Sequence, residues 1–190
     1  APITVTLDSV EIREADFGTT LSLIRGTAAV MKEMGYKVGG FRATISSSVL
    51  RGSGLSSSAA FEVLIGAIID GLYNGFVVDA KTRAVIAQKV ENIYFGKPCG
   101  LMDQMASSVG GMVTIDFKTE DAQVEAIACD FAARGYALCV VNTGGDHGDL
   151  TDDYAAIRTE MESVAAHFGK KVLREVPQEE VESHIGELRK

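Results

Sequence analysis

The chain has 190 residues, of which 46% are hydrophobic, so it is long enough and apolar enough to bury a core. Its formal net charge at pH 7 is −8, which argues against a nucleic-acid partner because such a partner needs a basic face. The longest apolar stretch, residues 63–73, contains Asp70 and is too short to cross a bilayer, so we expect no membrane partner. The three cysteines are widely spaced and odd in number, which favours a reduced, cytoplasmic setting.

The first fifty residues predict a strand, a helix and a second strand. Apolar residues alternate at Ile3, Val5 and Leu7, which is typical of a half-buried strand. Thr19 or Thr20 caps a helix that ends at Gly35, because apolar residues recur between them at steps of three and four. Residues 41–49 then predict the second strand.

A turn rich in glycine and serine, residues 52–58, joins this strand to a helix that runs to Tyr73. Glycines let backbone N–H groups crowd together, and the first turn of a helix has N–H groups without intrahelical partners, so the turn suits an anion such as a phosphate. Serine hydroxyls can also ligate Mg²⁺. A lone Gly-X-Gly would more often be a flexible loop with a serine N-cap, and the residues alone leave that alternative open.

The remaining elements follow from periodicity and from turn residues. We predict helices, strands and one loop in this order: helix 79–95, helix 100–109, strand 113–117, strand 124–128, a buried central strand 136–141, a loop at 142–150, a helix from Thr151 to Phe168, and a short helix from Pro177 to Leu188.

Two carboxylates are candidates for chemistry. Asp103 lies in the first turn of a predicted helix, where a carboxylate can orient a substrate hydroxyl and accept its proton. An isolated Asp at such a position more often serves only to start the helix. Glu91 has apolar neighbours on its helix and therefore needs a partner, which is either Mg²⁺ or a salt bridge with Lys89 or Arg83.

Two further features favour a structural role. Tyr154 lies on the apolar stripe of its helix, so core packing is its default role. Asp146, His147 and Asp149 are close together in the loop at 142–150, but too few further ligands are evident for a metal site, and we expect a solvated loop.

Two strings of residues resemble one family. Gly-Ser-Gly-Leu-Ser-Ser-Ser-Ala-Ala at 52–60 resembles the phosphate loop of the GHMP small-molecule kinases, and Cys-Gly-Leu-Met-Asp-Gln at 99–104 resembles the Cys-Gly-Ile-Met-Asp-Gln segment of their galactokinase branch. The resemblance covers roughly residues 39–168. It implies an α+β, two-lobed fold, with an incomplete nucleotide lobe at 1–143, similar to domain 2 of ribosomal protein S5, and the start of the C-terminal lobe at 144–190.

The resemblance also implies a function: ATP-dependent phosphorylation of galactose at its C1 hydroxyl, with ATP and Mg²⁺. Asp103 matches the family's catalytic aspartate, and Ser58 and Glu91 match its Mg²⁺-binding serine and glutamate. Gly100, Asp103 and Tyr154 match positions that contact the sugar, although Asp-Asp-Tyr replaces the usual Ser-Glu-Tyr at Tyr154. The residues implied in ATP binding are Gly52, Ser53, Gly54, Leu55, Ser56, Ser57 and Ser58.

The chain also departs from the family pattern. It lacks the family's N-terminal Gly-Arg-Val-Asn-Leu-Ile-Gly-Glu-His-like segment and its C-terminal Gly-rich segment, and Arg51 stands where Pro is common. It begins at Ala1 without Met, which indicates an internal fragment or a removed Met. We therefore expect the missing segments to be partners of this chain, and the 190 residues alone to be inactive. Two alternatives stay open: a sister kinase for N-acetylgalactosamine, arabinose or a uronic acid, and a galactokinase-like regulator that binds ATP and sugar without turnover.

Overall fold

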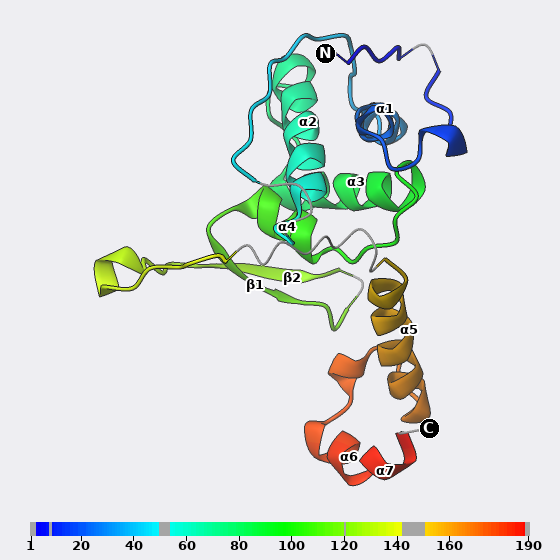
Figure 1. Ribbon diagram of the computed structural model, residues 1–190, viewed down its shortest axis with the longest axis vertical. Helices are drawn as coiled ribbons and strands as arrows, with labels where there is room; N and C mark the ends of the chain where they lie inside the picture. The colour runs from blue at the N-terminus through cyan, green and yellow to red at the C-terminus, as the bar shows by residue number, and fades with distance from the viewer. Residues whose placement is uncertain (1–2, 8, 50–53, 120, 142–150, 189–190) are drawn as a thin grey trace.

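The computed structural model describes residues 3–7, 9–49, 54–119, 121–141 and 151–188. Within these ranges the chain forms seven α-helices, several short 3₁₀ turns and one two-stranded sheet (Figure 1). The elements are α1 (Thr20–Glu33), α2 (Ser57–Tyr73), α3 (Ala80–Ile93), α4 (Met102–Val109), β1 (Met112–Asp116), β2 (Gln123–Ile127), α5 (Thr151–His167), α6 (Gln178–Ser183) and α7 (Ile185–Leu188).

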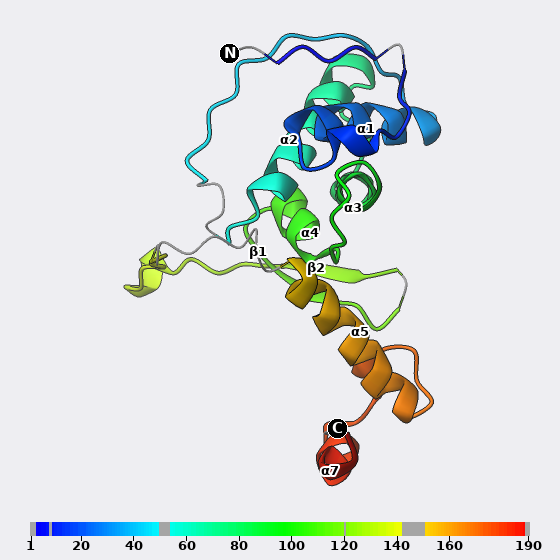
Figure 2. The ribbon, with the colours of Figure 1, turned by 45° about the vertical axis from the view of Figure 1, so that its right-hand side comes forward.

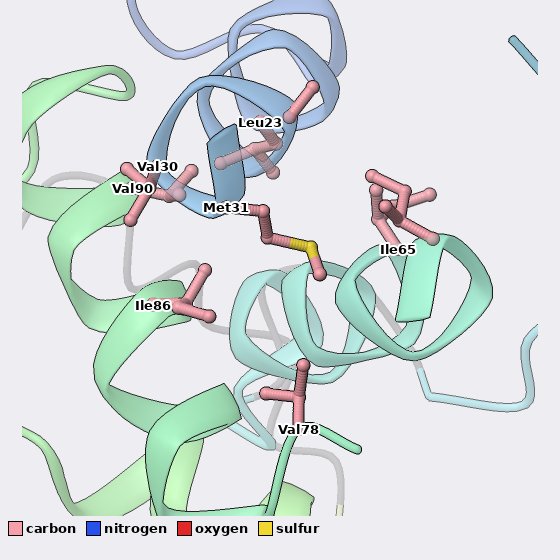
Figure 3. Close-up of a cluster of buried hydrophobic side chains, with 9 residues drawn as sticks. Leu23, Val30, Met31, Ile65, Val78, Ile86 and Val90 are labelled. Carbon is pink, nitrogen blue, oxygen red and sulfur yellow. The ribbon is translucent and has the colours of Figure 1, made fainter. Parts of the chain in front are cut away.

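The first three helices pack against one another, and α4 packs against α2 and α3 (Figures 1 and 2). They share one core of aliphatic side chains and a methionine (Figure 3): Leu23, Ala28, Val30, Met31, Ile65, Ile69, Val78, Ile86 and Val90. Burying one large aliphatic side chain contributes about 1.5–3 kcal/mol. The bundle of α1 to α4 is therefore the stable body from which the site residues project.

Local sequence signals account for the ends of these helices. The side chain of Thr19 accepts a hydrogen bond from the N–H of Ser22, and that of Asp79 accepts one from Thr82 at 2.9 Å, so both predicted N-caps are confirmed. Gly26 allows α1 to approach the end of α3, since a Cβ at this position would lie 2.7 Å from the Tyr94 side chain.

Asp70 is fully buried near the end of α2 and holds the turn that leads to α3. Its carboxylate accepts hydrogen bonds from the N–H groups of Val77 and Val78, both at 3.1 Å, and lies 3.6 Å from the Arg83 guanidinium. The sequence pattern marked this aspartate only as an interruption of an apolar run. In the structure it connects two core helices.

Asp70→Asn should lower the free energy of unfolding by about 1–3 kcal/mol, because an amide offers one acceptor oxygen to two buried N–H groups and no charge to Arg83. Urea unfolding measures the change. The matched control is Asp121→Asn, whose side chain is 79% exposed and should change stability by less than about 0.5 kcal/mol. Equal stability of the two variants would contradict this role of Asp70.

The two strands form an antiparallel hairpin in which Met112 pairs with Ile127 and Asp116 with Gln123. They confirm the predicted strands at 113–117 and 124–128 to within one residue. The hairpin follows directly after α4, which places it against the lower end of the helical bundle (Figure 1). The described part of the chain is therefore mixed helix and strand, as an α+β fold requires.

Three other predicted strands are wrong. Residues 3–7 and 41–49 have no regular structure, and residues 42–48 are exposed. The predicted central strand at 136–141 is neither regular nor buried, since Leu138 is 83% exposed and Val141 is 80% exposed. The physical reason is that a strand needs a neighbour for its backbone hydrogen bonds, and no other described segment pairs with these three.

Helix α5 extends away from the bundle, as Figures 1 and 2 both show, and the short helices α6 and α7 follow it. The predicted helix is confirmed, but Ile157 and Met161 on its apolar stripe are 51% and 45% exposed. The predicted lobe boundary at 143/144 lies in 142–150, outside the described residues. No helix in the described ranges combines the length and the apolar composition that a membrane span needs.

Candidate functional site

Three helix segments meet at one place on the bundle. The N-terminal end of α2 lies beside α4, and α3 packs against both helices (Figure 2). Ser56, Ser57 and Ser58 begin α2, Glu91 lies near the end of α3, and Asp103 lies in the first turn of α4. The structure thus gathers the predicted serines and both predicted carboxylates, which lie 33 and 47 residues from their serine partners in the sequence.

Ser56 occupies an unusual backbone conformation at the start of α2. It is the N-cap residue, with φ 54° and ψ 51°, and such left-handed values are uncommon for any residue other than glycine. Its side chain does not cap the helix. The hydroxyl instead donates a hydrogen bond of 2.5 Å to Oδ2 of Asp103. The N–H groups in the first turn of α2 are therefore left without a cap from this residue.

Ser58 and Glu91 form the second contact between helices. The Ser58 hydroxyl donates to Oε1 of Glu91 at 2.9 Å, and Gln104 Nε2 donates to Oε2 at 2.6 Å. Lys97 Nζ lies 3.8 Å from Oε1. Glu91 is only 2% exposed, so these polar groups compensate a charge that the helix carries into the interior.

The alternative role of Glu91, a salt bridge, is present with Lys97, but the two partners suggested for it, Lys89 and Arg83, are wrong. Lys89 Nζ binds Glu33 at 2.8 Å, and Arg83 donates to the carbonyl oxygen of Val78 at 2.8 Å. Lys89 is two positions from Glu91 and therefore lies on a different side of α3, whereas Arg83 lies about two helical turns away. The buried charge of Glu91 is instead compensated by Ser58 of α2, Gln104 of α4 and Lys97 in the loop between α3 and α4.

Glu62 belongs to the same buried group, although sequence reasoning missed it. It is 1% exposed, and neither carboxyl oxygen has a hydrogen-bond partner among the described residues. Burial first, and then the negative charge of Glu91, raises the pKa of Glu62 to about 9, while the nearby Gln104 amide offsets part of the rise. Its position one helical turn after Ser58 is the sequence signal that could have revealed it.

The raised pKa of Glu62 gives a testable pH dependence. Between its ordinary value of 4.5 and about 9, the folded protein keeps a proton that the unfolded chain has released. Stability should therefore fall as pH rises through this window, by at most about 1.4 kcal/mol per pH unit from this group. Glu62→Gln cannot lose this proton, so the wild type should lose stability relative to the variant between pH 5 and pH 9. Urea unfolding with EDTA at pH 5, 7 and 9 measures the difference, and a difference independent of pH would contradict the assignment.

Cys99 also contacts Gln104, whose Nε2 lies 3.4 Å from the cysteine sulfur. Burial and the charge of Glu91 raise the pKa of the Cys99 thiol to about 12. The thiol is therefore protonated at neutral pH and is a poor nucleophile. All three cysteines of the chain are free.

Other predicted site residues are described only in part. Gly52 and Ser53 lie outside the described residues, whereas Gly54 and Leu55 are exposed just before α2. Gly100 is exposed between α3 and α4. Tyr154 is a residue of α5, but its side chain lies outside the described part of the structure, as does the whole loop with Asp146, His147 and Asp149.

The arrangement offers two chemical functions side by side. Uncapped N–H groups at the start of α2 can bind an anion, with the helix dipole in the favourable sense. The hydroxyl and carboxylate of Ser58 and Glu91 are oxygen ligands of the kind that Mg²⁺ prefers. Within the described residues no group of three or more His, Cys, Asp or Glu side chains could hold a metal.

Comparison with known proteins finds similarity over the residues that form this site. Residues 22–111 match the family model of the GHMP kinases N terminal domain, a range that includes most of α1, all of α2, α3 and α4, and all three contacting segments. A galactokinase of Streptomyces coelicolor is 33% identical over 95% of this chain and 48% of its own length. A galactokinase of Pyrococcus furiosus is 32% identical over 86% of this chain and 46% of its own length, and one of Streptomyces lividans is 33% identical over 97% and 47%. The chain therefore spans about half the length of the curated relatives it matches.

Proposed function

Since this chain belongs to the GHMP kinases through the domain at residues 22–111, we propose that the whole protein transfers a phosphoryl group from ATP to the C1 hydroxyl of galactose. One observation carries the proposal. A single helix end presents Ser56 to Asp103 and Ser58 to Glu91, so an anion site, a pair of oxygen ligands and an exposed carboxylate all meet at the start of α2.

The proposed ATP site is the turn at residues 52–58 together with the first turn of α2. Phosphoryl transfer needs mainly positioning and neutralisation of negative charge. Ser58 and Glu91 would hold Mg²⁺, which supplies charge neutralisation to the phosphates when it is bound. Lys97, at 3.8 Å from Glu91, already provides positive charge at this position.

The proposed acceptor site is on the α4 side of the turn. Asp103 is exposed, and Ser56 is its one hydrogen-bond partner among the described residues, so it can accept a hydrogen bond from a sugar hydroxyl. We propose Gly100 and Tyr154 as further sugar contacts on the basis of the family resemblance. We also retain as proposals a two-lobed architecture and a lobe boundary at 143/144.

Galactose is the acceptor favoured by the names of the relatives, all three of which are galactokinases. The test is ADP release by the full-length protein with Mg²⁺, ATP and a panel of galactose, N-acetylgalactosamine, arabinose, galacturonic acid and glucose, with ³¹P NMR of the product. We expect galactose to give the highest kcat/KM and an anomeric phosphate. A higher value for another sugar would assign a sister kinase, and ATP and sugar binding without turnover would assign a regulator.

A further inference from the structure

The inference concerns the side chain of Ser56 and rests on the proposed function. A serine at a helix N-cap usually accepts a hydrogen bond from the helix's own N–H groups. Thr19 does so at the start of α1, and Asp79 does so at the start of α3. Ser56 does not, although α2 is a helix of 17 residues whose first-turn N–H groups have the same need.

The backbone explains the difference. Thr19 and Asp79 have extended backbone angles, which aim an N-cap side chain back at its own helix, whereas Ser56 is left-handed. Within the described residues, Ser56 and Phe76 are the two non-glycine residues with positive φ. Such a conformation is unfavourable for a serine, and a fold retains it only where other contacts compensate.

The compensating contact is the hydrogen bond to Oδ2 of Asp103, from a serine that is half-buried to a carboxylate that is exposed. It fixes one oxygen of a side chain that solvent would otherwise leave free to rotate. Oδ1 has no hydrogen-bond partner among the described residues. The same backbone turn therefore does two things at once: it directs the Ser56 side chain away from the α2 N–H groups, and it holds one oxygen of the Asp103 carboxylate.

We propose that Ser56 is the positioning residue of Asp103: its hydroxyl holds Oδ2 so that Oδ1 is presented to the acceptor hydroxyl, at a fixed distance from the phosphate-binding end of α2. Ser56 links the two substrate sites through one side chain. The Ser56 hydroxyl therefore affects turnover through Asp103. Any contact of the Ser56 backbone with the nucleotide is a separate effect.

Three substitutions distinguish the role of the Ser56 hydroxyl from the role of its left-handed backbone conformation. Ser56→Gly adopts positive φ without strain but has no donor, and Ser56→Ala has the strain and no donor. Ser56→Asn tolerates the left-handed conformation and restores an N–H donor. In the full-length protein with the best sugar of the panel, we expect Gly and Ala each to lower kcat by about 10- to 100-fold, a larger factor than any change in KM for ATP. Asn should recover most of kcat.

A double-substitution cycle completes the test. Ser56→Gly introduced into Asp103→Asn should cause less than a twofold further loss of kcat, because a residue that acts through Asp103 has nothing left to position. Full kcat in Ser56→Gly, or an additive loss in the double variant, would overturn the proposal while leaving the kinase assignment intact. Absence of wild-type turnover with every sugar would overturn both.

Discussion

Asp103→Asn should lower kcat of the full-length protein by about 10²- to 10⁴-fold, the range that positioned acid–base groups contribute. The substitution keeps the shape of the side chain and removes the charge that would accept or attract the proton of the acceptor hydroxyl. Asp103 is exposed at the first turn of α4, and Met105 N–H still bonds to Leu101, so the helix retains its start. KM for ATP should change less than kcat, because an amide oxygen at this position can still accept the hydrogen bond from Ser56 at the start of α2.

The control for this prediction is Asp121→Asn, which removes an equal charge from an exposed position next to β2. Steady-state kinetics of both variants, with thermal unfolding to show that each is folded, give the comparison. Near-normal kcat in a folded Asp103→Asn protein would assign Asp103 a purely structural role at the start of α4.

Glu91→Gln should lower kcat/KM by at least about 10²-fold and weaken the apparent affinity for Mg²⁺. Substitution of residues that merely orient a metal ligand costs about 10- to 100-fold, and a ligand itself should cost no less. The amide keeps the volume of the buried side chain but replaces a charged oxygen that faces Ser58 and Lys97. A titration of activity against Mg²⁺ concentration measures the change, and added Mg²⁺ should recover part of the lost rate.

Glu33→Gln is the matched control for Glu91→Gln. It removes a glutamate whose partner, Lys89, is on the same helix as Glu91, but the pair is at the surface. It should leave the Mg²⁺ dependence unchanged. If both variants retain wild-type Mg²⁺ dependence, Glu91 does not bind the metal, and its contacts with Ser58 and Gln104 serve packing alone.

The helices could be predicted from the sequence because their signals are local. Thr19 and Asp79 cap their helices as expected, and apolar steps of three and four mark the buried faces of α1, α2 and α3. The hairpin was also predictable, because its two strands are close in sequence and pair with each other. The strands expected at 3–7, 41–49 and 136–141 depend on partners elsewhere, and local periodicity carries no information about whether a partner is present.

The candidate site was predictable in its residues but not in its contacts. The family resemblance pointed to Ser58, Glu91 and Asp103, and the structure brings each of them to the start of α2. The left-handed conformation of Ser56 could not be predicted, because it opposes the preference of serine and depends on a contact 47 residues away. The buried Glu62 carries no motif of its own, and its surroundings come from two other helices.

We propose that the start of α2 binds the phosphates of ATP next to Mg²⁺ held by Ser58 and Glu91. The most direct measurement is a crystal structure of the full-length protein with a non-hydrolysable ATP analogue and Mn²⁺, whose anomalous signal locates the metal. We expect phosphate density against the N–H groups at the start of α2 and an anomalous peak at the Ser58 and Glu91 oxygens. Nucleotide bound at another site, with the start of α2 empty, would contradict it.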